Sequence, residues 1–203
     1  MTEILQETNL EKKQRPIFII NPAEVMKNGS LFPPLALALM NSSLKKSGYV
    51  PAVIDLMFDN DLKQIRDINA ENGIYFLTFS TKLFDRVSEI IKIVRSKDGN
   101  ALIMGGGAHP TARKEKIFEE LDLDAIALGE VRVTDIVNAL HSDDWAARFA
   151  ELKGVIYKYN GQIHINKPVD AWDDLDNIPL PDYSPFPMER YFKSQGFRAV
   201  SLT

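Results

Sequence analysis

The sequence predicts an α/β fold built on a doubly wound parallel sheet. From Arg15 onward, short apolar runs alternate with segments of helical periodicity, the pattern of a parallel sheet that helices cover on both faces. Five such strand and helix units precede Ser142. Because crossovers between parallel strands are almost always right-handed, the units predict a five-stranded, Rossmann-like open sheet, for which we favour the flavodoxin-like strand order 2-1-3-4-5.

Short apolar runs rich in β-branched and aromatic residues mark the strands. The strands are predicted at residues 17–20, 50–56, 74–79, 101–104 and 125–128, and the helices at 35–46, 62–70, 84–98, 115–121 and 133–140. The first helix begins after Pro33-Pro34, because the first amides of a helix have no partner within the helix and proline has no amide proton to leave unpaired. Gly48 is predicted to end it. In the third helix, Phe84, Val87 and Ile91 recur at spacings of three and four, which predicts one apolar face.

The pattern changes after Ser142. Two strand-like runs flank Asn160-Gly161, the strongest short signal for a two-residue hairpin turn. Residues 168–187 carry five of the eleven prolines and five aspartates, a composition that disfavours helix and sheet and predicts an extended linker. We therefore divide the chain into a flexible N-terminus (1–14), a Rossmann-like domain (15–142), a β-hairpin (143–167) and a linker (168–203) whose last residues resemble the start of a new strand.

Composition excludes several classes of function. The chain has 203 residues and no cysteine, which excludes disulfides, thiolate nucleophiles and cysteine-ligated zinc or iron–sulfur sites. Its 24 basic and 28 acidic residues leave a net charge of -4, without a basic cluster that would follow a nucleic-acid backbone. No apolar run is long enough to span a bilayer, and residues 1–14 lack the apolar core of a signal peptide. We expect a cytoplasmic protein with no nucleic-acid or membrane partner.

Candidate binding residues follow the predicted strands, because open parallel sheets bind ligands beyond the carboxyl ends of their strands. Gly105, Gly106 and Gly107 follow the fourth strand and remove every side chain where the backbone would meet a ligand. They indicate either a flat ligand or nucleotide tail on this loop, or a tight turn rich in glycine. Ser80 and Thr81 end the third strand and offer either ligand hydroxyls or a helix N-cap.

The loops after the fourth and fifth strands add further candidates. Gly129 and Glu130 follow the fifth strand and Thr134 lies one helical turn on, so ligand contact and helix capping both remain open. His109 is the only histidine in these loops. Its sequence position is compatible with a ligand, an acid–base group or a surface residue. The other histidines, His141 and His164, lie too far away in the sequence to suggest a shared metal site, and no metal ligand is predicted.

Motifs of several enzyme classes are missing. Asp55 ends the second strand, where a dinucleotide-binding fold places its ribose-binding acid, but no Gly-x-Gly-x-x-Gly follows the first strand. The sequence also lacks the Gly-x-x-x-x-Gly-Lys-Ser/Thr loop of nucleotide triphosphatases and the Gly-x-Ser-x-Gly elbow of hydrolases. The chain by itself therefore offers no basis for catalysis.

Several short motifs occur in one order along the predicted sheet. They are Pro33-Pro34-Leu35, Ser80-Thr81, Gly106-Gly107-Ala108-His109-Pro110-Thr111, and Asp124 through Gly129-Glu130 with Thr134. In this order and spacing the sequence resembles the N-terminal domain of cobalamin-binding radical S-adenosylmethionine proteins. The resemblance continues through residues 152–157 and 174–181 and covers about residues 16–203.

The resemblance implies that the chain carries a corrinoid cofactor, cobalamin, for a radical module. The implied cofactor-binding residues are Pro33, Leu35, Ser80, Thr81, Gly105, Gly106, Gly107, His109, Gly129, Glu130 and Thr134. In the family, a C-terminal radical module with a Cys-x-x-x-Cys-x-x-Cys motif holds the 4Fe-4S cluster that cleaves S-adenosylmethionine, and this motif is absent here. The implied parent protein is a methyltransferase, or a related carbon–carbon bond-forming enzyme or cyclase, and its own radical module would be this chain's partner.

One family motif is missing, and two alternative functions remain. The Asp-x-His-x-x-Gly motif that supplies a lower histidine to cobalt in methionine synthase-like domains is absent after the first strand. The same sheet and glycine loop suit a module that binds flavin or another cofactor. They also suit a structural domain whose pocket is vestigial. The visible spectrum of a bound pigment distinguishes cobalamin from flavin, and a lack of corrinoid affinity would support the structural alternative.

Overall fold

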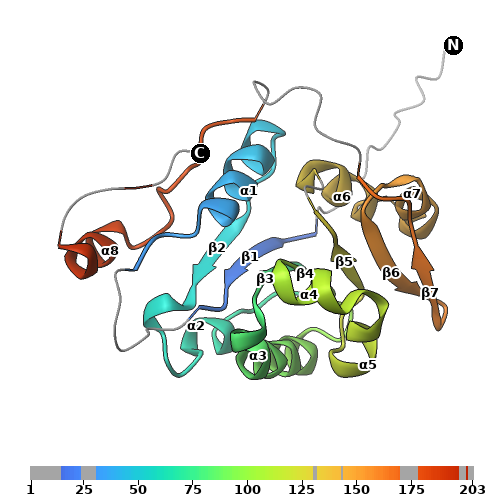
Figure 1. Ribbon diagram of the computed structural model, residues 1–203, viewed down its shortest axis with the longest axis horizontal. Helices are drawn as coiled ribbons and strands as arrows, with labels where there is room; N and C mark the ends of the chain where they lie inside the picture. Colours follow the sequence, from blue (N-terminus) through green and yellow to red (C-terminus); the bar gives the residue numbers. More distant parts are fainter. Residues whose placement is uncertain are drawn as a thin grey trace, which may run out of the picture.

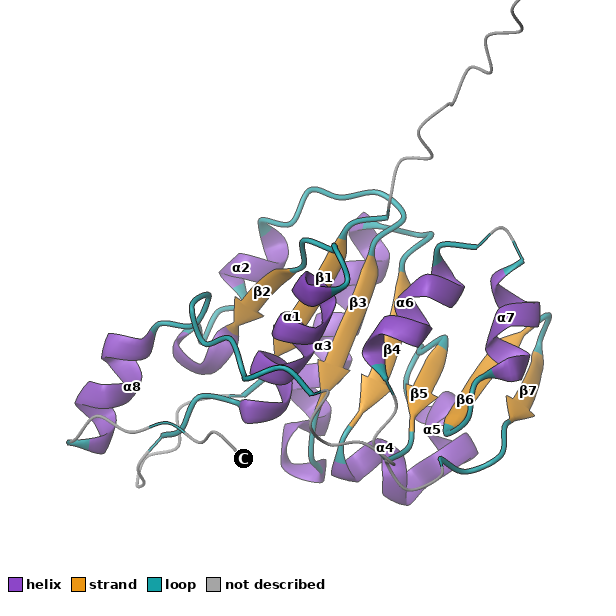
Figure 2. Ribbon diagram, turned by 90° about the horizontal axis from the view of Figure 1, so that it is seen from above, coloured by secondary structure: helices purple, strands orange, loops and turns teal. Residues whose placement is uncertain are grey.

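The computed structural model describes residues 15–23, 31–129, 132–142, 144–169, 178–196 and 200. Seven strands form one sheet in the order β2-β1-β3-β4-β5-β6-β7. The strands are β1 (Ile17–Asn21), β2 (Ala52–Asp55), β3 (Ile74–Thr78), β4 (Leu102–Gly106), β5 (Ala125–Ala127), β6 (Val155–Tyr159) and β7 (Gln162–Ile165). The first five strands are parallel, β6 pairs antiparallel with β5, and β7 pairs antiparallel with β6. The predicted order 2-1-3-4-5 is confirmed. The predicted hairpin is present, and it extends the main sheet because β6 pairs with β5 (Figure 2).

Helices cover both faces of the sheet. The α-helices are α1 (Leu35–Lys46), α2 (Lys63–Arg66), α3 (Phe84–Lys97), α4 (Ala108–Arg113), α5 (Ile117–Glu120), α6 (Val133–Leu140), α7 (Trp145–Glu151) and α8 (Met188–Gln195). Single 3-10 turns occupy Leu56–Phe58, Thr81–Leu83 and Lys114–Lys116. Figure 1 shows α1, α6 and α7 on one side of the sheet and α2, α3 and α5 on the other. In the part of the chain that the structure describes, no helix is long and apolar enough to cross a membrane.

Two apolar cores follow from the alternation of side chains along each strand. Ile19, Phe76 and Met104 point toward α1 and α6, while Leu77 and Ile103 point toward α3. Each fully buried aliphatic side chain contributes about 1.5–3 kcal/mol. The fold is therefore stabilised on both faces of the central strands, as the near-continuous apolar runs in the sequence predict.

The structure differs from the predicted elements in several places. The fourth strand continues through Gly106, because Gly105 and Gly106 pair with Leu77 and Thr78 of β3, and a helix begins at Ala108. The loop expected after the fourth strand is therefore only one residue long, Gly107. Two more helices, α7 and α8, occupy segments where only a hairpin and a linker were expected. The strand expected over residues 198–203 lies outside the described residues, apart from Val200.

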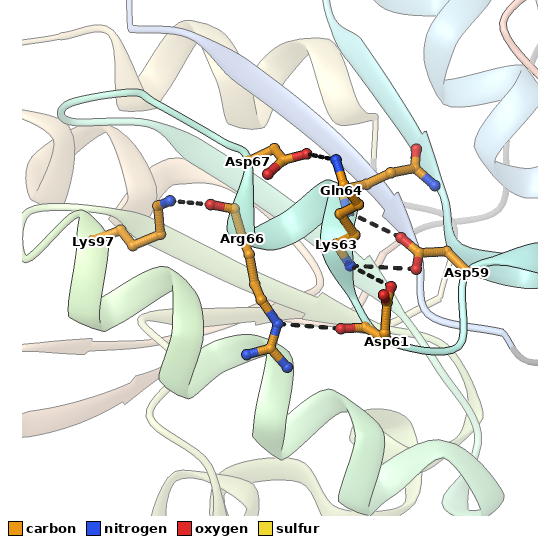
Figure 3. A network of polar contacts seen from close by, with 7 residues as sticks. All are labelled: Asp59, Asp61, Lys63, Gln64, Arg66, Asp67 and Lys97. Atoms are coloured by element: carbon orange, nitrogen blue, oxygen red, sulfur yellow. Dashed lines mark hydrogen bonds and ion pairs between the residues drawn. The ribbon is translucent and has the colours of Figure 1, made fainter.

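The second helix is shorter than predicted. It comprises only Lys63–Arg66, preceded by Leu62 in the left-handed conformation at a φ of 57°. The carboxylates of Asp59 and Asp61 accept hydrogen bonds from the amide of Lys63 at 3.3 and 3.1 Å, and Asp67 pairs with the Lys63 ammonium at 2.6 Å (Figure 3). The carboxylates of Asp59 and Asp61 thus cap the amino end of this turn, and an exposed ion pair joins its two ends. Ile65 packs into the core.

Candidate functional site

A cavity of about 740 Å³ opens between α1, α6 and the carboxyl half of the central strands. Its lining residues are Ala36, Leu39, Met40, Ser43, Lys46, Ser47, Phe76, Leu77, Thr78, Met104, Gly105, Gly106, Gly107, Ala127, Gly129, Arg132, Val133, Thr134, Ile136, Ile178 and Pro179. This volume lies in the range of about 300–1,000 Å³ that is typical of small-molecule and cofactor sites. The cavity also lies where doubly wound sheets bind their ligands.

The floor of the cavity is a row of small residues. Thr78 and Gly106 are paired neighbours at the ends of β3 and β4, and Ala127 ends β5. The preceding row on the same face contains the larger Phe76 and Met104, which close the core. A Cβ added at Gly106 would find only the Thr78 hydroxyl oxygen within 4 Å, at 3.8 Å. The cavity therefore exists because the last row on this face has almost no side-chain volume.

The three consecutive glycines serve three different purposes. A Cβ at Gly105 would point to the opposite face, 3.0 Å from the Leu123 Cδ1 atom. Gly106 leaves the cavity floor open. Gly107 has a φ of 93°, and a Cβ there would lie 2.9 Å from the carbonyl oxygen of Phe79. Only Gly107 is thus required by backbone conformation, and Gly106 is the glycine that makes room for a ligand.

The walls of the cavity are helical. The residues of α1 that line it begin at Ala36 and end at Lys46, a length of about 15 Å at 1.5 Å per residue. At its far end α1 meets α6, where the Tyr49 hydroxyl contacts Asn138 and the Tyr49 ring stacks on His141 with the centroids 5.4 Å apart. The space between the helices is therefore a slot that closes away from the carboxyl edge of the sheet.

The charge of the lining favours an anionic ligand. Lys46 and Arg132 are its charged members, and none of the described residues that line the cavity is acidic. Ser43, Thr78 and Thr134 add hydroxyl groups to a lining that is otherwise mostly apolar. Such a surface suits a flat apolar group joined to a sugar or phosphate, because hydroxyls and cations bind the polar part.

The predicted binding residues divide into three groups. Gly105, Gly106, Gly107, Gly129 and Thr134 line the cavity. Pro33, Leu35, Ser80, Thr81 and His109 lie outside the lining. Glu130 lies outside the described residues. The glycine loop and the start of α6 therefore meet at the cavity, whereas the hydroxyls after β3 do not reach it.

His109 is a packed residue on the opposite side of the glycine loop. Its side chain is only 10% exposed and lies against the rings of Phe79 and Phe84, with centroids 5.8 and 5.2 Å away. Its Nδ1 atom is 3.0 Å from the Thr81 hydroxyl, and its amide donates to the Phe79 carbonyl at 3.2 Å. The surface interpretation of His109 is wrong, since the histidine ties the loops after β3 and β4 together. No cluster of three metal-ligating side chains occurs among the described residues.

Asp55 forms part of a buried polar network. Its carboxylate accepts hydrogen bonds from the Asn21 amide at 2.7 Å and the Tyr191 hydroxyl at 2.6 Å. Burial, followed by the bond to Asp55, raises the pKa of the Tyr191 phenol far above its usual value. The acid that a dinucleotide fold would offer to a ribose is therefore bound to α8 instead.

Sequence reasoning missed most of the walls. The face of α1, the small residues Thr78 and Ala127, and the segment with Ile178 and Pro179 were not expected to line a site. Small side chains at the last inward position of two strands, beside a glycine, are the signal that could have identified the floor. Nothing local in the sequence indicates that residues 178 and 179 return to the sheet.

The fold and the cavity define the chain as a doubly wound α/β protein with a ligand-sized slot at the carboxyl edge of its sheet. The chain matches no protein-family model. It is 29% identical over 178 residues to an uncharacterised methyltransferase of Pyrococcus horikoshii, an alignment that covers 83% of this chain and 37% of the relative.

Solved structures share the fold. The radical S-adenosylmethionine methyltransferase TsrM of Kitasatospora setae, with cobalamin and a 4Fe-4S cluster bound, matches 83% of this chain and 31% of its own, with a TM-score of 0.62 and 18% identity. The cobalamin-dependent S-adenosylmethionine radical enzyme OxsB matches 84% of this chain and 24% of its own, with a TM-score of 0.63 and 17% identity. The resemblance seen in the sequence is confirmed, and the chain spans about a quarter to just over a third of these proteins.

Proposed function

We propose that this chain binds cobalamin and that the slot between α1, α6 and the sheet takes the nucleotide tail of the cofactor. The observation that carries the proposal is Gly106, whose missing side chain keeps the floor of the slot open. A benzimidazole base needs an apolar slot, and the adjoining ribose and phosphate need hydroxyl and cationic partners. Leu39 and Met40 would contact the base, and Ser43 and Lys46 on the same helix would hold the polar part.

The chain would be the cofactor-carrying part of a radical S-adenosylmethionine enzyme, a methyltransferase or a related carbon–carbon bond-forming enzyme or cyclase. When bound, the cofactor supplies a methyl group or a reactive cobalt centre to chemistry carried out with a module outside this sequence. The relative from Pyrococcus horikoshii and the fold of TsrM and OxsB support this assignment. The residues of this chain would bind and orient the cofactor and exclude water from its tail.

No histidine of this chain is placed to coordinate cobalt from the slot. The chain has three histidines. His109 packs behind the glycine loop, His141 stacks on Tyr49, and His164 stacks on Tyr157 with ring centroids 4.9 Å apart. None of them lines the cavity. The slot would therefore hold the cofactor through apolar, hydroxyl and cationic side chains, without an imidazole from this chain.

Titration with hydroxocobalamin tests the proposal. Gly106→Trp should abolish binding, because the indole fills the slot while an extended backbone and a free Cβ direction let the protein fold. Gly99→Trp is the matched control, since a Cβ at Gly99 meets nothing within 4 Å and the residue lies beyond the cavity lining. Calorimetry and visible spectra should show wild-type and control binding alike. Equal binding by Gly106→Trp would refute the site, and binding of flavin in place of cobalamin would refute the cofactor.

A further inference from the structure

Residues 178–187, which we call the strap, run alongside α1 and lead to α8 (Figure 1). Asp182 fastens the strap to α1. Its carboxylate accepts hydrogen bonds from the Asn41 amide at 3.0 Å and the Lys45 ammonium at 2.7 Å, and its own amide donates to the Ala38 carbonyl at 3.1 Å. The contacts come from one face of the helix, at positions three and four residues apart, so a single aspartate spans nearly two turns of α1.

The attachment has the features of a specific contact. Asn41 is fully buried on α1, so its amide would lose hydrogen bonding if the strap moved away. The hydrogen bond from Lys45, and after it that from Ser184, lowers the pKa of Asp182 to about 2, so the aspartate is charged at every physiological pH. The strap then continues to a second anchor, where Tyr191 of α8 binds Asp55 and the Gln195 amide donates to the Leu31 carbonyl at 2.8 Å.

The strap also forms part of the cavity. Ile178 and Pro179 lie four and three residues before Asp182, and both line the slot together with the floor residues of β3 and β4. Both side chains are half-buried, whereas the next residue, Leu180, is 78% exposed. The apolar surface that Ile178 and Pro179 give to the slot therefore depends on where Asp182 holds the chain.

We propose that Asp182 is a positioning residue, which holds Ile178 and Pro179 as a wall of the slot and so slows the escape of the bound tail. This inference rests on the proposed function for its ligand but not for its geometry. Loss of the aspartate should loosen the wall, widen the slot in the empty protein and speed the dissociation of the cofactor. A purely structural role would lower stability without changing either the access to the slot or the rate of dissociation.

Two measurements test the inference, one without any cofactor. The chain has no cysteine, so Thr78→Cys places a single thiol on the cavity floor, and its rate of reaction with a maleimide dye reports access to the slot. Asp182→Ala should raise this rate, and it should raise the dissociation rate of hydroxocobalamin about tenfold, as the loss of charge-assisted hydrogen bonds predicts. Asp182→Asn, which keeps the shape and the bond to Ser184, should have an intermediate effect.

Asp67→Ala is the control, because it also breaks a lysine–aspartate pair, on α2 across the sheet from the slot (Figure 3). It should leave both rates unchanged. If Asp182→Ala does not change the labelling rate of Thr78→Cys, Asp182 does not hold a wall of the slot. An unchanged dissociation rate of hydroxocobalamin would contradict the proposed role equally. If wild-type protein fails to bind hydroxocobalamin, the proposed function falls, whereas the labelling rates still decide the role of Asp182.

Discussion

Replacing Gly107 by alanine should destabilise the protein, whereas the same change at Gly106 should not. Gly107 has a φ of 93° and a ψ of -169°, a conformation that side chains rarely adopt. An alanine Cβ would also lie 2.9 Å from the Phe79 oxygen and 3.0 Å from the Phe79 nitrogen. Those atoms cannot move away cheaply, since Phe79 donates to Gly106 at 3.0 Å and accepts from His109 at 3.2 Å.

The expected changes in the free energy of unfolding have opposite signs in the two variants. For Gly107→Ala, a rare backbone conformation costs about 1–3 kcal/mol, and a weakened buried hydrogen bond adds about 0.5–1.5 kcal/mol, so the loss should be about 2–4 kcal/mol. Gly106 has an extended backbone and a Cβ direction whose nearest atom is 3.8 Å away. Alanine there restricts the unfolded chain without a clash and should stabilise the protein by about 0.4–1 kcal/mol.

Urea unfolding of the two variants measures the difference. The slope of free energy against urea should stay constant, so that the shift in midpoint reports stability alone. Gly99→Ala serves as a control for a glycine in open space. If Gly107→Ala lost no more stability than Gly106→Ala, the assignment of separate roles to these glycines would be wrong.

Three further predictions concern the polar network, the strap and the cofactor. Tyr191→Phe removes one hydrogen-bond donor from the buried Asp55 carboxylate and should lower the free energy of unfolding by about 1.5–3 kcal/mol, measured by chemical denaturation. Tyr159→Phe, which changes an exposed tyrosine, should not have this effect. The folded pKa of Asp182 is about 2, below its unfolded value, so its contribution to the free energy of unfolding is complete above about pH 5 and is lost as pH falls toward 2. The difference in stability between wild type and Asp182→Asn should therefore shrink over that pH range. A constant difference would contradict the pairing of Asp182 with Lys45. Bound and reduced to cobalt(II), cobalamin should give an electron paramagnetic resonance spectrum without nitrogen splitting from a lower ligand, and such splitting would contradict the proposed place of the base.

Much of the fold could be predicted because its signals are local. Residues 35–46 and 133–140 form helices at the predicted bounds, since prolines and glycines punctuate the first and a strong apolar stripe marks the second. Right-handed crossovers restrict the sheet to a few doubly wound orders, and the favoured one, 2-1-3-4-5, is the order observed. The short helix α2 starts within one residue of its predicted position, where Asp59 and Asp61 cap the Lys63 amide, but it ends four residues early, at Arg66.

The site was only half predictable, because its floor depends on register. Gly106 is conspicuous in the sequence, but Thr78 becomes its neighbour only through the pairing of β3 with β4. Likewise, Ser80 and Thr81 follow the correct strand, yet the 3-10 turn that begins at Thr81 directs this segment toward His109 and away from the slot. The position of a residue after a strand predicts that it lies at the carboxyl edge of the sheet. The face of the sheet that its side chain contacts depends on the alternation of side chains within each strand.

The C-terminal segment supplies hydrogen-bond partners to two buried polar residues of the doubly wound fold. Asn41 lies on the buried face of α1, and Asp55 is only 7% exposed at the end of β2. Either would be costly if left without partners. Asn41 donates to Asp182, and Asp55, which already accepts from Asn21, accepts a further hydrogen bond from Tyr191. Asp182 and Tyr191 are 141 and 136 residues away in the sequence, a separation that no local pattern reveals. Because these two contacts come from residues 178–196, this segment folds with the sheet. Removing it would take away the acceptor of the Asn41 amide, one donor to the Asp55 carboxylate and a wall of the slot together.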